Sequence, residues 1–292
     1  MNRREFLAAT ASAPLLPQPA SSGGRLVVCV HQVSSNSFDY RTSLEGYAKA
    51  GIRAVEVVLA KAKEFADKES PAAARRLLDD LGLKAVSSSN QLGVVEPNPN
   101  RAKALDDLKW KCELAQRLGA DRLVVVPVTT AKIVADDYNR GVDNLREAAD
   151  IARPFNVSLM LEFFKFSTFI NCLATSLMMV RAAGHPNARL MLDTFHFWNG
   201  PSKLEDFERL HDGELAHLHF EDTPDDPPRE LIEQRHRVLP GDGIAPLKRI
   251  VEAARRKKYA GPLSVELTDP QFHQMDPFQL AAKIRAAVQP FV

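Results

Sequence analysis

The chain has 292 residues, and its 38 Lys and Arg residues nearly balance 37 Asp and Glu residues, giving a formal net charge of +1. A charge so close to zero creates no global field that would attract nucleic acid or an anionic membrane surface. The three cysteines are far apart and odd in number, which does not indicate a disulfide framework. The length suits one large α/β barrel or two smaller domains. The expected partner is therefore a small molecule, and a homo-oligomer is compatible with the composition.

The first 24 residues differ in composition from the rest of the chain. The motif RREFL at residues 3–7 precedes the uncharged stretch AATASAPLLPQPASSGG, an order of basic, apolar and small residues that resembles a twin-arginine export signal. The apolar part is interrupted by Pro14 and is too short to span a bilayer as a helix. We expect residues 1–24 to be an export signal and linker that direct the protein to the periplasm, with a disordered N-terminus on a cytoplasmic protein as the alternative. The remaining residues, 25–292, are the expected catalytic domain.

Eight short apolar segments follow one another from residue 25 onward, at intervals of roughly 25 to 40 residues. Most are rich in Val, Leu and Ile with little polar alternation, as strands buried on both faces should be. The predicted strands are Leu26–His31, Ala54–Leu59, Lys84–Ser88, Arg122–Val126, Ser158–Glu162, Arg189–Asp193, Ala216–Phe220 and Leu263–Leu267. No low-complexity linker interrupts them. The pattern predicts a (β/α)8 TIM barrel in a single domain.

Segments with helical apolar spacing lie between the predicted strands. Residues 71–81 place three leucines on one face, and residues 102–118 repeat the pattern. Glycine follows several predicted helices just before the next strand, where left-handed backbone geometry at a helix C-cap favours it. These glycines are Gly51, Gly82, Gly119 and Gly261. The helices are therefore expected to form the outer ring of the barrel.

Four of the predicted strands end in a carboxylate or an imidazole. Glu162 closes VSLMLE, Asp193 closes ARLMLD, His219 closes LAHLH and Glu266 closes PLSVE. The strand tips of a parallel barrel converge on one pocket. Three oxygen ligands and one imidazole suit a divalent cation of the Mn²⁺, Mg²⁺, Co²⁺ or Zn²⁺ kind. The sequence therefore predicts a metal-dependent enzyme.

Each of these residues also has a purely structural explanation. A carboxylate in an apolar strand must be compensated by a cation or a donor, so Glu162 and Glu266 could instead pair with a barrel Lys or Arg. Asp193 precedes a predicted helix and also suits an N-cap. His217 and His219 lie on one strand, and we expect only one of the two to face the barrel interior.

Longer motifs surround the same residues. They are LMLEFF with Glu162, LMLDTFHFW with Asp193 and His196, LAHLHFED with His219 and Asp222, RVLPGDG with Arg237 and Asp242, and GPLSVELTDP with Glu266. Together, from about Val157 to Thr268, they resemble the sugar phosphate isomerase/epimerase family of xylose isomerase-like TIM barrels, a superfamily that also includes endonuclease IV-type enzymes. The N-terminal half is compatible in layout but carries no equally sharp motif. The motifs are specific to the superfamily and much less specific to one reaction.

The resemblance implies a chemistry for the predicted site. It assigns the imidazole ligand to His219, and it implies a metal that binds a substrate carbonyl and stabilises the enediolate formed when the adjacent proton is removed. Glu162 and Glu266, on opposite sides of the substrate, would take and return that proton. The expected protein is an isomerase or epimerase of a keto sugar or a related hydroxy-carbonyl compound, such as an inosose or hydroxypyruvate.

A second layer of residues is expected to contact the substrate. Arg237 can offer a planar fork to a hydroxyl, carboxylate or phosphate, or form a loop salt bridge. His196 is expected to donate to or accept from a substrate hydroxyl, and Asp222 to orient Arg237 or the histidine ligand. His31 and Asn90, near the ends of the first and third strands, either line the same pocket or cap loops.

Three other functions are compatible with the sequence. Loss of a β-hydroxyl from the same enediolate would make the protein a dehydratase acting on an inosose or on dehydroshikimate. DNA repair of the endonuclease IV type uses a three-metal cluster rich in histidine, whereas the chain has only 8 His. The last alternative is a non-catalytic sugar-binding module with a vestigial site. Oxygen-rich sites with one histidine accept several divalent ions, so the sequence leaves the metal open.

Overall fold

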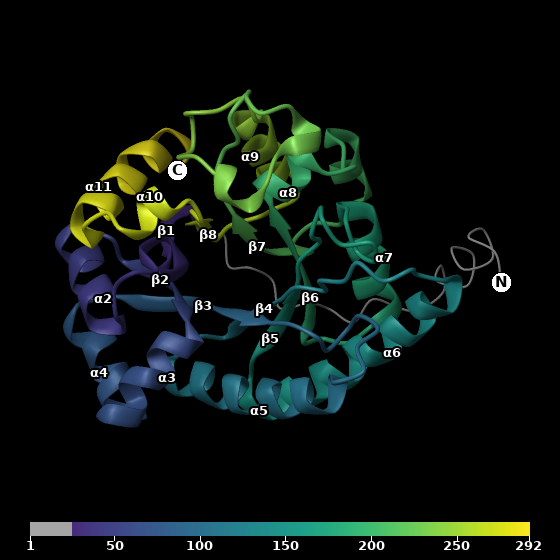
Figure 1. The fold of residues 1–292 in the computed structure, drawn as a ribbon, viewed down its shortest axis with the longest axis horizontal. Coiled ribbons are helices and arrows are strands. Elements are labelled where there is room, and N and C mark those ends of the chain that lie inside the picture. The colour runs from purple at the N-terminus through teal and green to yellow at the C-terminus, as the bar shows by residue number, and fades with distance from the viewer. Residues whose placement is uncertain (1–24) are drawn as a thin grey trace.

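The apolar segments form a closed barrel of eight parallel strands, surrounded by helices (Figure 1). The computed structural model describes residues 25–292. Strand order follows chain order, and the barrel closes where Val27 of the first strand pairs with Pro262 of the last. The predicted single-domain (β/α)8 fold is confirmed. The predicted export signal falls on residues 1–24, which lie outside the described residues.

The strands begin and end within three residues of their predicted bounds. They are β1 (Val27–His31), β2 (Ala54–Val58), β3 (Lys84–Gln91), β4 (Arg122–Val125), β5 (Ser158–Leu161), β6 (Ala188–Asp193), β7 (Leu215–His219) and β8 (Pro262–Val265). The largest difference is in β3, which continues past Ser88 to Gln91. The extension arises because Gln91 pairs with Val125 of β4 after a shift in register.

Helices follow the strands in alternation and form the outer ring. The α-helices are α2 (Tyr40–Lys49), α3 (Leu59–Lys68), α4 (Pro71–Asp80), α5 (Arg101–Leu118), α6 (Ala135–Ala152), α7 (Leu173–Ala183), α8 (Thr194–Asn199), α9 (Leu247–Arg256), α10 (Pro270–His273) and α11 (Pro277–Val288). The 3₁₀ helices are η2 (Gln32–Ser35), η3 (Arg153–Phe155), η4 (Leu204–Arg209), η5 (Arg229–Leu231), η6 (Gln234–His236) and η7 (Gln289–Phe291). The yellow helix α11 packs against the purple helix α2, which closes the ring (Figure 1). No helix within residues 25–292 combines the length and the apolar character needed to cross a membrane.

Three of the four predicted C-cap glycines adopt left-handed geometry. Gly51, Gly82 and Gly119 have φ values of 81°, 63° and 82°. Gly261 was expected to do the same, and this prediction is wrong. Helix α9 ends at Arg256, and the residue with positive φ after it is Lys258. Gly261 lies beyond that turn, where the chain enters β8, so the reversal is complete before the glycine is reached.

Two separate apolar clusters hold the barrel together. The larger one lies between the strands and the helix ring and contains Leu159 and Leu161 of β5. The smaller one contains Met160 of the same strand, together with Val124 and Met191 from β4 and β6. Because successive strand residues point to opposite faces, this division identifies the small cluster as the filling of the barrel interior.

The barrel interior beneath the ends of the strands is polar. Glu56, His217 and His219 are fully or almost fully buried there, and their side chains contact one another. The expectation that only one of the two histidines faces inward is therefore wrong. Residues two positions apart on a strand share a face, so His217 and His219 lie on the same side at different depths.

Candidate metal centre

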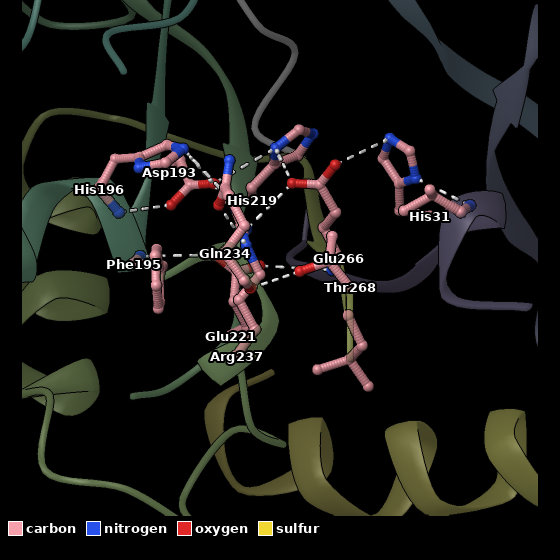
Figure 2. Close-up of polar contacts among 12 residues, drawn as sticks. His31, Asp193, Phe195, His196, His219, Glu221, Gln234, Arg237, Glu266 and Thr268 are labelled. Carbon is pink, nitrogen blue, oxygen red and sulfur yellow. Dashed lines mark hydrogen bonds and ion pairs between the residues drawn. The ribbon is translucent and has the colours of Figure 1, made fainter. Parts of the chain in front are cut away.

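The ends of four consecutive strands bring the predicted ligands together. Glu162 and Glu266 directly follow β5 and β8, whereas Asp193 and His219 are the last residues of β6 and β7. One ligand atom from each lies within 4.8 Å of all the others. We call these four residues the strand-end cluster, and Figure 2 shows three of them, Asp193, His219 and Glu266, pointing toward one another.

The Nδ1 atom of His219 lies close to all three carboxylates of the strand-end cluster. It lies 3.6 Å from Glu162 Oε1, 3.7 Å from Asp193 Oδ2 and 3.5 Å from Glu266 Oε2. This nitrogen is buried and has no hydrogen-bond partner within the described residues. Atoms that ligate one ion tetrahedrally at about 2.1 Å lie about 3.4 Å apart. The spacing of the cluster therefore fits a single divalent cation.

Asp193 combines both roles considered for it. Its Oδ1 accepts a hydrogen bond of 2.7 Å from the backbone N–H of His196 and so caps helix α8. Its Oδ2 faces His219 and Arg237. The cap holds the carboxylate in one orientation and leaves the second oxygen available as a ligand.

Glu56 is a site residue that sequence reasoning missed. It lies in the middle of β2, and its Oε2 is 2.7 Å from His217 Nε2 and 3.2 Å from His219 Nε2. Ser264 Oγ also donates to this oxygen, at 2.8 Å. Because the Glu56 carboxylate can only accept a hydrogen bond, the proton of a neutral His219 ring lies on Nε2. The Nδ1 atom then has a free lone pair, which points toward the strand-end cluster. The sequence feature that could have identified Glu56 is that it is the one acidic residue within the apolar strand AVEVV.

His31 both caps a loop and reaches the site. Its Nδ1 accepts a hydrogen bond of 3.0 Å from the backbone N–H of Val33, so the proton of the neutral ring lies on Nε2. That atom is 3.5 Å from Glu56 Oε1 and 3.6 Å from Glu266 Oε1. His31, Glu56 and His219 also lie close enough to hold a metal, but a protonated Nε2 cannot be a ligand. Asn90 is exposed, and its backbone carbonyl accepts a hydrogen bond from Lys111.

Arg237 is buried among carboxylates and is only 1% exposed, which excludes a surface salt bridge. Its Nη1 lies 2.8 Å from Asp193 Oδ2, 3.0 Å from Glu266 Oε2 and 3.0 Å from Glu221 Oε1. Its Nε and Nη2 both donate to Gln234 Oε1. The guanidinium therefore holds two members of the strand-end cluster in place, as Figure 2 shows.

Glu221 is the second residue that sequence reasoning missed. Besides Arg237, its carboxylate accepts hydrogen bonds from the backbone N–H groups of Phe195 and Glu266, at 3.4 and 3.3 Å. Glu221 therefore links the segments that follow β6, β7 and β8 through hydrogen bonds. The sequence feature that could have identified Glu221 is its position two residues after His219, which places the two side chains on the same side of an extended chain.

Asp222, which was expected to orient Arg237 or His219, has a different role. Its oxygens accept hydrogen bonds from the backbone N–H groups of Thr223, Gly241 and Ala245. No hydrogen bond or ion pair joins it to Arg237 or His219 within residues 25–292. Asp222 therefore shapes the loop that follows β7. The neighbouring acid, Glu221, faces the site in its place.

His196 lies beside the strand-end cluster as a neutral ring. Burial lowers the pKa of His196 to about 4, and Arg237 contributes to the decrease. Arg237 Nη2 donates to His196 Nε2 at 3.2 Å, so the ring proton lies on Nδ1, which is buried without a partner. The edge of Phe164 packs against the ring, with 4.6 Å between centroids. His196 thus carries one unused donor next to the site.

The ionisable groups of the site influence one another strongly. Burial raises the pKa of Glu162 to about 8, with further contributions from Asp193 and Glu266. Burial and Asp193 also hold the pKa of Glu221 well above its usual range. Burial opposes the ionisation of Glu266, but Arg237 and His219 outweigh it, so its pKa is lowered. The site therefore offers both ionised and protonated carboxyl groups at neutral pH.

Comparison with known proteins links this geometry to enzymes of sugar chemistry. Over 174 residues the chain is 33% identical to an inosose isomerase from Halalkalibacterium halodurans, a match that covers 59% of this chain and 61% of the relative. The aligned part is thus less than two thirds of that relative. A D-psicose 3-epimerase from Ruminiclostridium cellulolyticum is 27% identical, with 78% of each chain covered. A 3-dehydroshikimate dehydratase from Pseudomonas putida is also 27% identical, over 82% of this chain and 38% of the relative.

Solved structures share the fold. The IolI protein with a zinc atom bound superposes with a TM-score of 0.84 at 23% identity, covering 91% of this chain and 99% of that one. A D-psicose 3-epimerase in the presence of D-fructose gives 0.71 at 22% identity, covering 90% and 97%. Residues 44–289 match the family described as the xylose isomerase-like TIM barrel. Because this match covers most of the chain, the protein belongs to the xylose isomerase-like TIM barrel family, within the sugar phosphate isomerases and epimerases that its motifs resemble.

Proposed function

We propose that the protein is a divalent-metal-dependent isomerase or epimerase acting on a small polyhydroxylated ketone, such as an inosose or a keto sugar. The similarity to an inosose isomerase and to a D-psicose 3-epimerase supports this substrate class. The observation that carries the proposal is His219 Nδ1, a buried nitrogen without a partner that lies 3.5 to 3.7 Å from three carboxylates. A cation bound to Glu162, Asp193, His219 and Glu266 would satisfy it.

The chemistry needs a proton to leave a carbon atom and another to return. A divalent cation at the strand-end cluster would polarise a substrate carbonyl and so acidify the adjacent C–H group. Glu162 and Glu266 follow β5 and β8, which lie on different sides of the barrel. One carboxylate can therefore take the proton to give an enediolate, and the other can return a proton to the neighbouring carbon or to the opposite face.

The remaining site residues prepare these two carboxylates and the substrate. Arg237 contacts Glu266 Oε2 and Asp193 Oδ2 and favours their ionised forms. His196 keeps a free Nδ1–H donor for a substrate hydroxyl. If a substrate oxygen binds Arg237 as well, the guanidinium must exchange one of its present partners for it.

Deuterium exchange tests the proposal directly. The purified protein, loaded in turn with Mn²⁺, Mg²⁺, Co²⁺ and Zn²⁺, is incubated in D₂O with inososes and ketohexoses, and the recovered sugars are examined by NMR and mass spectrometry. We expect deuterium at a carbon next to the carbonyl of recovered or epimerised sugar, and no exchange in Glu266→Gln. Absence of exchange with every sugar and metal, in a protein shown to bind metal, contradicts the proposal.

A dehydratase is the second candidate, because a 3-dehydroshikimate dehydratase matches 82% of this chain. The same proton abstraction would then be followed by departure of a β-hydroxyl. The product would be an unsaturated or dicarbonyl compound with ultraviolet absorbance. Growth of this absorbance with an inosose or with dehydroshikimate, without exchange into recovered substrate, would favour the dehydratase.

We also propose, from the sequence alone, that residues 1–24 are a twin-arginine export signal. The prediction can be tested by fusing them to a reporter that is active only after export. Replacing both Arg3 and Arg4 by lysine should abolish the reporter signal. Equal reporter signal from both fusions would contradict the prediction.

A further inference from the structure

A cavity lies at the opposite end of the barrel from the strand-end cluster. Its volume is about 590 Å³, within the range of small-molecule pockets. The lining residues come from the N-terminal ends of β1, β2, β3, β4 and β8 and from the C-terminal part of α11 and beyond. We call it the basal cavity. None of its lining residues belongs to the strand-end cluster, and β-strands of this length separate the two sites by about 15 Å.

The basal cavity is strongly cationic. Five basic residues line it, and the only acidic side chain in the lining is Asp121. The basic residues are Arg25, Arg53, Lys84, Arg122 and Arg285. Four of them stand at or just before the start of four consecutive strands, β1 to β4. Because strand starts converge at this end of a parallel barrel, the topology gathers charges that are far apart in the sequence.

Part of this charge has a structural explanation. Helices of a βα barrel end at the same face as the strands begin, and their last carbonyl groups attract cations. Arg53 Nη1 donates to the carbonyl of Ile52 at 2.8 Å, and Arg285 Nη1 donates to that of Ala50 at 3.2 Å. These two arginines therefore bind carbonyl groups of the segment that joins α2 to β2.

The other three cations are not accounted for in this way. The side chains of Arg25 and Lys84 make no hydrogen bond or ion pair within the described residues. In residues 25–292 the side chain of Arg122 has one ion pair, a loose one with 3.5 Å between its Nε and Asp121 Oδ1. Three cations around one concave space, with one acidic side chain among them, give the basal cavity a charge that favours an anionic ligand.

The floor of the basal cavity is apolar. Val27 is 41% exposed although it belongs to a strand of the barrel, and Val28, Ile52, Val86 and Pro262 also line the space. A simple inorganic anion would leave this surface in contact with water. A ligand with a flat or apolar body and several negative oxygens would match both the floor and the cations.

We propose that the basal cavity binds an organic phosphate such as a nucleoside diphosphate. The phosphate groups contact Arg25, Lys84 and Arg122, and the organic body lies on Val27 and Val86. The multiple charges of a diphosphate match the three cations better than a single carboxylate does. The inference is independent of the proposed function, because it uses other residues at the other end of the barrel.

Isothermal titration of the full-length protein with ADP, and with adenosine as the uncharged probe, tests this proposal. We expect saturable one-to-one binding of ADP and no binding of adenosine at the same concentrations. In the double variant Lys84→Gln, Arg122→Gln the affinity for ADP should fall by about tenfold or more, since two charge-assisted contacts are lost. The matched control, Lys63→Gln with Lys68→Gln, removes two exposed charges from α3 and should change the affinity by less than about twofold.

Two further measurements separate the basal cavity from the strand-end cluster. ADP should bind Asp193→Asn as well as it binds the unaltered protein, and ADP should slow acetylation of Lys84 but not of Lys63 in the unaltered protein. The proposal is overturned if ADP shows no saturable binding, if adenosine binds equally well, or if the double variant retains full affinity. It is also overturned if Asp193→Asn loses the binding, because the phosphate then occupies the metal centre.

Discussion

The two ends of the barrel carry opposite charges in opposite surroundings. Four carboxylates gather at the C-terminal end, where the strands finish, and a fifth, Glu56, lies just below them within β2. The four are Glu162, Asp193, Glu221 and Glu266, and all five are buried except Glu266, which is partly exposed. The five cations at the N-terminal end, in contrast, lie around an open cavity. The net charge of +1 conceals this polarity.

The difference in burial between the two ends shows where charges affect one another most strongly in this molecule. Charges in a buried network interact through a low effective dielectric and shift one another's pKa, whereas exposed charges are screened by water and salt. Helix N-termini surround the acidic end and helix C-termini the basic end, so the helix dipoles favour the same separation. We therefore expect large, specific effects from substitutions at the C-terminal end and small effects from surface or capping substitutions.

The largest expected effect is on catalysis, from Glu266→Gln. The amide keeps the shape of the side chain but cannot accept the substrate proton, so turnover of the best substrate should fall by about 10² to 10⁴. Deuterium exchange and product formation measure the loss. Glu252→Gln makes the same chemical change on the exposed face of α9 and should leave turnover unaltered. Turnover within tenfold of normal in Glu266→Gln would exclude a proton-transfer role for this carboxylate.

The next largest effect concerns metal binding through a residue that is not expected to touch the metal. Glu56 lies 3.2 Å from His219 Nε2 and sets the orientation of its ring. Glu56→Gln should therefore weaken metal affinity by about 10- to 100-fold, as measured by competition with a chromophoric chelator. Asp193→Ala, which removes a ligand, should weaken it further. If Glu56→Gln binds metal normally, the buried network below the strand-end cluster has no influence on the site.

Metal affinity should also depend on pH. Burial raises the pKa of Glu162 to about 8, and Glu56 and Glu266 together outweigh burial and raise the pKa of His219 well above its usual value. Both groups hold protons at pH 7 in the metal-free protein and must release them to become ligands. Apparent affinity should therefore rise with pH between about 6 and 8, by about tenfold per unit for each proton released.

Calorimetric titrations with metal in buffers of different ionisation enthalpy count the released protons. Release of one or more protons at pH 7 is the expected result. An affinity that does not change over this pH range would mean that the ligands are already deprotonated before metal arrives.

The smallest effect is expected from an acid at the same end of the barrel that serves only a helix. Asp276 Oδ1 accepts hydrogen bonds from the backbone N–H groups of Phe278 and Gln279 and so caps α11. Asp276→Ala should lower stability by about 1 kcal/mol and the melting temperature by about 2 to 4 °C, without changing metal affinity. Asp276→Asn retains the cap and should melt near the normal temperature. A loss of metal affinity in Asp276→Ala would show that helix capping and the metal centre are coupled.

The sequence predicts the barrel and the four residues of the strand-end cluster for a local reason. A buried strand that ends in Glu, Asp or His has one consistent environment in a parallel barrel, the pocket at the strand tips. Predictions for loops were less successful. Asp222 was expected at the site, but the chain after His219 turns so that Glu221 faces Arg237 and Asp222 binds backbone N–H groups. A one-residue difference in a loop decides which of two adjacent acids faces the site. Strand-like alternation continued past His219 would have favoured Glu221, but it does not show how far beyond the strand the alternation persists.

By itself the sequence determines which segments become strands and which carboxylates and imidazole stand at their ends, because both depend on neighbouring residues. Only the tertiary structure decides what lies beneath the strand-end cluster and at the far end of the barrel. Glu56 and His219 are 163 positions apart and meet only because the strands close into a ring. The cations of the basal cavity are likewise scattered, from Arg25 to Arg285, until the starts of the strands converge. Closure of the barrel turns these distant charges into neighbours, and it separates the acidic end from the basic one.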